Sequence, residues 1–147
     1  MNSNLFAVPE QSMPLSAALL ALRVLAGCAF VIHGWPKLQH PLSWMGPSSS
    51  TPGVLQGLAA VAEFFGGLGW MVGALTPLAS FGIASTMVVA VVRHAVLKGD
   101  PFVAQEGPSW ELAALYLCVA LVLIAAGPGR YSLDAAVQLR TMNGRHS

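Results

Sequence analysis

Four long apolar segments, separated by loops rich in proline, glycine and polar residues, dominate the pattern of the chain. They cover approximately residues 14–34, 53–75, 77–94 and 110–129. A helix needs about 20 mainly apolar residues to cross the hydrocarbon core of a bilayer. The pattern therefore predicts four membrane-crossing helices, and we expect them to pack as an all-α bundle with short loops.

Polar segments flank this predicted bundle. Residues 1–13 are polar and turn-rich, and we expect a flexible N-terminal tail there. Residues 14–134 form the predicted transmembrane domain, and residues 135–147 the C-terminal tail. Near this boundary Ser132 can cap a short amphipathic helix.

Composition supports the membrane interpretation. The 147 residues are 55% hydrophobic and 9% charged, whereas a soluble domain is roughly 25% charged. A net charge of +1 gives no reason to expect a nucleic-acid partner. Cys28 and Cys118 lie inside apolar segments, where a thiol usually packs as a small hydrophobe, so we expect no disulfide. No Cys/His spacing indicates a metal site.

Two ionisable residues lie within the predicted membrane spans. Arg23 is about nine residues into the first segment and Glu63 about ten residues into the second. An unpaired Arg at the bilayer centre costs roughly 2.5–3.5 kcal/mol by insertion scales. Because the two helices are antiparallel neighbours, we expect both side chains at one depth and predict that they pair. This pair is either a static clasp or part of a polar site that binds or relays a ligand.

A second polar group is expected at one membrane interface, because the first and third segments end on the side where the fourth begins. Its members are His33, Lys37, Arg93, His94 and Glu111. They could be side chains that reach toward water from helix ends, or a site for the carbonyls of a quinone or the phosphate of a lipid. A haem held between two of the histidines has weaker support.

Three strings carry a resemblance to a known family: "LRVLAGCAFVIHGWPKL", "AEFFGGLGWMVGALTPLAS" and "GPGRYSLDA". The third is the most specific, because nothing generic requires that order at a helix end. It contributes the family-motif residues Gly127, Pro128, Gly129, Arg130, Tyr131, Ser132 and Asp134. On these strings the chain resembles the DoxX family of small bacterial inner-membrane proteins, which are four-helix bundles.

The resemblance implies a bacterial inner-membrane location with cytoplasmic termini, which the loop charges alone leave open. Relatives in this family include the small membrane subunit of a thiosulfate:quinone oxidoreductase. Another is a membrane anchor in an oxidant-resistance complex with soluble sulfur-handling and superoxide-handling enzymes. The resemblance thus favours a membrane subunit or anchor of a redox complex over a catalyst by itself.

Quinone is then the expected cofactor, and the expected partners are the lipid bilayer, soluble redox enzymes and further copies of the chain. Two alternatives stay open. One is a transport protein for a small molecule or protons, and the other is a non-catalytic membrane scaffold.

Overall fold

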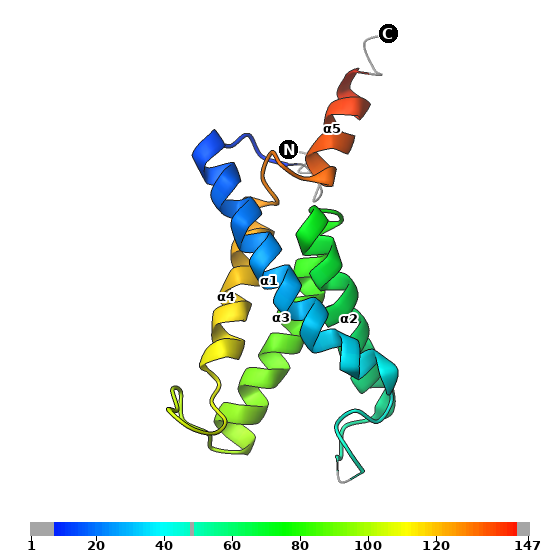
Figure 1. Cartoon of the computed structure of the whole chain (residues 1–147), viewed down its shortest axis with the longest axis vertical. Coiled ribbons are helices and arrows are strands. Elements are labelled where there is room, and N and C mark those ends of the chain that lie inside the picture. Colours follow the sequence, from blue (N-terminus) through cyan, green and yellow to red (C-terminus); the bar gives the residue numbers. More distant parts are fainter. Residues whose placement is uncertain (1–7, 48, 144–147) are drawn as a thin grey trace, which may run out of the picture.

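The described part of the chain, residues 8–47 and 49–143 of a computed structural model, is helical and contains no strand. Its helices are α1 (Met13–Gln39), α2 (Gly53–Val72), α3 (Thr76–Val91), the π-helical segment η1 (Val92–Leu97), α4 (Glu111–Ala126) and α5 (Leu133–Asn143) (Figure 1). The all-α prediction is confirmed, and the fifth α-helix in this part, α5, is the short C-terminal helix expected after Ser132. Residues 1–7 and 144–147 of the predicted tails lie outside the described residues.

Within the described residues, three segments are long and apolar enough to cross a membrane: α1, α2, and the continuous stretch formed by α3 and η1. The 16 residues of α4 are apolar but span only about 24 Å at 1.5 Å per residue. Large aliphatic side chains point outward, among them Leu25, Ile32 and Val89, which are 74%, 71% and 65% exposed. Lipid is a better environment than water for such a surface, and the protein is a membrane protein.

The four longer helices pack in chain order. The α1 helix packs along α2, α3 packs between α2 and α4, and α1 and α4 touch only sparsely. The loops 40–52 and 98–110 lie at one end of the bundle, which we call the loop end (Figure 1). The start of α1 and the segment that connects α4 to α5 lie at the opposite end, called here the α5 end (Figure 1).

The first helix begins where the sequence predicts but ends later. Ser12 caps it, because its Oγ accepts a hydrogen bond from the backbone N–H of Leu15 at 3.4 Å. It runs on to Gln39, beyond the predicted end at residue 34. Gly34 does not stop the helix; it is buried against α2, where a Cβ would lie 2.7 Å from the backbone nitrogen of Phe64. This glycine thus permits close packing instead of ending the helix.

Glycines bring the backbones of α1 and α2 into direct contact. A Cβ at Gly27 would lie 2.7 Å from the carbonyl oxygen of Gly67, and a Cβ at Gly67 would lie 2.8 Å from that of Gly27. Backbone atoms cannot move aside as a flexible side chain can. The longitudinal register of the two helices is therefore determined by these contacts, and every side-chain pairing between them follows from it.

The segment before α1 is bonded to the other end of the chain. The N–H of Val8 donates to Oε1 of Gln138 in α5 at 2.6 Å, and Nε2 of Gln138 donates to the carbonyl of Val8 at 3.4 Å. Gln11 also donates from Nε2 to the carbonyl of Ala126 at the end of α4. These contacts hold residues 8–12 against the α5 end.

Replacing Gly67 by Ala should destabilise the bundle by about 1–3 kcal/mol, because a new methyl group would overpack a backbone contact. Gly57, on the same helix, is the matched control: a Cβ there would meet Leu42 Cδ2 at 3.4 Å, an ordinary contact. Gly57→Ala should be neutral or slightly stabilising. Thermal unfolding of both purified variants in detergent measures this, and equal stability of Gly67→Ala and the native protein would contradict the packing described.

Candidate functional site

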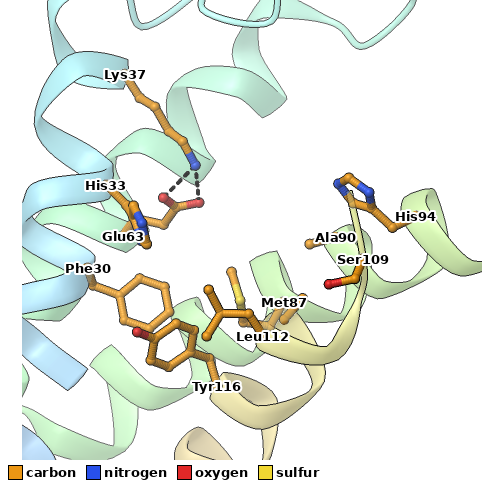
Figure 2. A pocket seen from close by; sticks show the side chains of 11 residues that line it. Phe30, His33, Lys37, Glu63, Met87, Ala90, His94, Ser109, Leu112 and Tyr116 are labelled. Atoms are coloured by element: carbon orange, nitrogen blue, oxygen red, sulfur yellow. Dashed lines mark hydrogen bonds and ion pairs between the residues drawn. The ribbon is translucent and has the colours of Figure 1, made fainter. Parts of the chain in front are cut away.

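A cavity of about 270 Å³ opens between the α1/α2 and α3/α4 pairs near the loop end (Figure 2). Its lining combines an apolar floor with a polar rim. The floor consists of Phe30, Met87, Ala90, Leu112, Ala113 and Tyr116, and the rim of His33, Lys37, Glu63, His94 and Ser109. The helices contribute these residues at helical spacing: positions 30, 33 and 37 lie on one face of α1, and 112 and 116 on one face of α4.

An ion pair stands on the polar rim of this cavity. The Lys37 ammonium contacts both carboxylate oxygens of Glu63, at 2.6 Å and 2.5 Å. The Glu63 side chain is only 5% exposed, whereas that of Lys37 is 23% exposed. Lys37 also lies over the Trp44 ring, 4.4 Å from its centroid. The pair thus keeps a buried carboxylate compensated while its cation borders the cavity (Figure 2).

The predicted pairing of Arg23 with Glu63 is wrong. The glycine contacts place Gly34 beside Phe64, so Glu63 lies next to the turn of α1 that contains Gly34. Arg23 is eleven residues from that turn, which is roughly 16 Å along the helix at 1.5 Å per residue. Arg23 instead faces Gly73, where a Cβ would lie 2.5 Å from Nη1. The error came from assuming that both helices start at their respective membrane faces.

Arg23 bonds to backbone carbonyls at the α5 end. Its Nη1 donates to the carbonyl of Trp70 at 2.8 Å, and its Nη2 donates to the carbonyl of Tyr131 at 2.6 Å. The last carbonyls of a helix lack intrahelical partners and carry the negative end of its dipole. A fully buried guanidinium is therefore stabilised by the C-terminal end of α2. It also ties the connector after α4 to the bundle.

Two polar side chains of the family motif, those of Asp134 and Ser132, act as helix caps. The Asp134 carboxylate accepts from the N–H of Leu75 at 2.8 Å and of Thr76 at 2.9 Å, where α3 begins. Leu75 has a left-handed backbone with φ of 48°, which a side chain disfavours, and the Asp134 bonds help to hold it. Ser132 Oγ accepts from the N–H of Ala135 at 3.2 Å, which confirms the predicted cap of α5.

The motif begins directly after α4 and closes against the start of α1. The backbone N–H of Arg130 donates to Ser16 Oγ at 3.3 Å. Gly129, with φ of 82°, passes so near that a Cβ would lie 3.3 Å from the Cα of Ser16. Among the described residues the motif thus joins α1, α2, α3 and α5, and none of its members lines the cavity.

The predicted interface group is only partly brought together. His33, Lys37 and His94 line the same cavity. Arg93 does not; its Nη1 lies 3.4 Å from Sδ of Met45 in the loop 40–52. Glu111 is exposed at the start of α4 and is also absent from the lining.

Glu63 and the apolar floor were not assigned to this group from the sequence, although the floor residues of α1 and α4 share helical spacing with the polar ones.

Comparison with known proteins identifies the family. The DoxX family profile matches residues 18–95, more than half of the chain. The chain belongs to the DoxX family. An uncharacterized protein of Haemophilus influenzae is similar to this DoxX protein, with 31% identity over 120 residues that cover 79% of this chain and 87% of that protein. No solved structure matches the chain. The matched range contains Lys37, Glu63 and both cavity histidines.

Removal of Lys37 should be more harmful than removal of both members of its pair. Lys37→Met leaves the buried Glu63 carboxylate without a cation and should lower the free energy of unfolding by about 2 kcal/mol. The loss is smaller than for a completely buried ion pair, because Lys37 is partly exposed. The double change Lys37→Met with Glu63→Leu should recover most of that loss. Thermal unfolding in detergent measures both, with Lys98→Met in the exposed loop as control. Equal damage from the single and double changes would contradict a mainly compensating pair.

Proposed function

We propose that this DoxX protein is the membrane subunit or anchor of a quinone-linked redox assembly, and that its cavity holds the quinone ring. The observation that carries the proposal is the division of the cavity into an apolar, aromatic floor and a polar rim. Phe30 and Tyr116 lie with ring centroids 4.8 Å apart at the floor. A flat ring that bears oxygen atoms at its edge fits such a lining.

The polar rim offers donors to a ring oxygen. An ammonium group has three N–H donors, and the two contacts of Lys37 with Glu63 leave one. His33 lies on the same face of α1, one turn away, and is exposed at the rim. A carbonyl oxygen placed between these side chains would find charge-assisted hydrogen bonds in a site that is partly shielded from water.

The cavity size agrees with a single substituted ring. Its volume of about 270 Å³ is slightly below the range of roughly 300–1,000 Å³ that is usual for ligand pockets, which leaves room for one ring and not for a larger ligand. The sparse contact between α1 and α4 offers a lateral exit toward lipid for an apolar tail. The ring would then sit near the loop end, and the tail would remain in the hydrocarbon region.

The chain itself supplies position and polarity in this proposal, and the electron transfer belongs to the cofactor and a partner enzyme. The partners we propose are soluble enzymes that handle sulfur compounds or reactive oxygen species. As further parts of the proposal, α4 is a fourth membrane crossing, the membrane is the bacterial inner membrane, both termini are cytoplasmic, and copies of the chain associate.

Transport of protons or small molecules has less support from the packing. Phe30 and Trp70 meet edge to face with centroids 5.5 Å apart, and both are almost completely buried. Trp70 also donates from Nε1 to Ser80 Oγ at 2.9 Å, which fixes its ring. These aromatic side chains fill the bundle between Glu63 and Arg23, where a path across the membrane would have to run.

Filling the cavity should abolish quinone binding. Ala90→Phe places a ring into the cavity, whereas Val89→Phe, one residue earlier, lies on the exposed outer face of the same helix. The purified protein in lipid nanodiscs is titrated with a short-tailed quinone in a calorimeter. Saturable binding should appear for the native protein and for Val89→Phe only. Binding that persists in Ala90→Phe, or is absent in the native protein, would refute the proposed site.

A further inference from the structure

His94 and Asp100 form a second polar pair at the rim of the cavity. Nδ1 of His94 lies 2.6 Å from Oδ2 of Asp100, and the two side chains are 29% and 14% exposed. Because the carboxylate accepts the proton on Nδ1, the imidazole tautomer is set and Nε2 remains for another partner. No described residue bonds to Nε2, and His94 lines the cavity (Figure 2).

The local backbone conformation brings His94 and Asp100 together. The chain leaves α3 through the π-helical segment η1, which contains His94. Such segments are rare in proteins, and those that occur are often found at functional sites. Gly99 follows with φ of 70°, a left-handed conformation that turns the chain back. The N–H of Asp100 then donates to the carbonyl of His94 at 2.9 Å. Backbone and side-chain bonds together hold the carboxylate against the ring.

We infer that His94, oriented by Asp100, is a proton acceptor for a hydroxyl group on a ring bound in the cavity. This inference rests on the proposed function, because it requires a ring bound in the cavity. It adds to that function the chemical class of the ligand. The site would recognise a phenolic ring, such as the hydroquinone form of a quinone, through a hydroxyl group that donates to Nε2. A carbonyl oxygen offers no proton to that nitrogen.

The proton step is balanced without any electron transfer. The O–H bond of the ring hydroxyl breaks, and its proton forms the Nε2–H bond of His94. The ring keeps the electron pair as an oxyanion, and the imidazolium is stabilised by the Asp100 carboxylate. The Lys37 ammonium lines the same cavity and contributes a positive charge there.

Other titratable groups at the cavity do not duplicate this role. Lys37 of α1 and Glu63 of α2 bond to each other, so Glu63 is committed to a cation. Tyr116 of α4 lies at the floor beside Phe30. His33 of α1 is exposed and has no carboxylate partner among the described residues. Among these groups, the carboxylate-oriented histidine is the one arranged as a base.

A phenol and its methyl ether separate the roles of the hydroxyl and of the ring. The probes are an alkylated nitrophenol, whose absorbance reports ionisation, and its methyl ether, titrated into the full chain in lipid nanodiscs. The native protein should bind the phenol at least about tenfold more tightly than the ether, since a charge-assisted hydrogen bond contributes on this scale. The bound phenol should absorb as phenolate.

His94→Leu should lose both the preference and the phenolate signal while it still binds the ether. His40→Leu, in an exposed loop, should behave as the native protein. A preference and phenolate signal that survive His94→Leu overturn the inference. If His94→Leu no longer binds the ether, Asp100→Asn decides: a weaker phenolate signal with intact ether binding supports the inference, and an unchanged signal overturns it.

The same titration separates this inference from the proposed function. If the native protein binds the phenol and the ether equally well, the cavity still binds a ring, but His94 is not its proton acceptor. If it binds neither probe, both fall.

Discussion

The direct contact of the α1 and α2 backbones at Gly27, Gly34 and Gly67 is the constraint on which the rest of the structure depends. In a membrane the hydrophobic effect does not drive helices together, so close packing has to provide much of their association. Glycine allows that packing only in one register, because a shift would place side chains where these backbones meet. The register then decides the polar contacts. It brings Lys37 to Glu63 at the loop end and leaves Arg23 at the opposite end.

Each buried charge in this bundle is compensated by a different means. Glu63 has a cationic side chain, whereas Arg23 has the carbonyls of Trp70 and Tyr131. Lys37 remains partly exposed to the cavity, whereas Arg23 is fully buried. The α5 end is therefore a structural junction in which the connector after α4 caps neighbouring helices. The loop end, where the two helix pairs separate around a cavity, holds the groups that can meet a ligand.

The sequence predicts the apolar spans, the cap at Ser132 and the convergence of His33, Lys37 and His94, because these depend on periodicity and chain direction. It does not predict the partner of Glu63, since pairing depends on the register of α1 and α2, and that register depends on which backbone positions meet at the glycines. Gly34 resembles a helix stop in sequence and acts as a packing contact in the structure. The bonds from Asp134 to the start of α3 join residues 59 and 58 positions apart, and no local signal marks them. The π-helical turn that carries His94 likewise has no sequence signature.

Cysteine cross-linking tests the register of α1 and α2 most directly. Sγ of Cys28 lies 3.9 Å from Sδ of Met71, whereas a register that paired Arg23 with Glu63 would place Cys28 opposite residue 58. In a Cys118→Ser background, oxidation of membranes should therefore form an intramolecular disulfide in Met71→Cys and none in Leu58→Cys. A disulfide in Leu58→Cys with none in Met71→Cys would contradict the helix register, and with it the ion pair and the cavity built upon it.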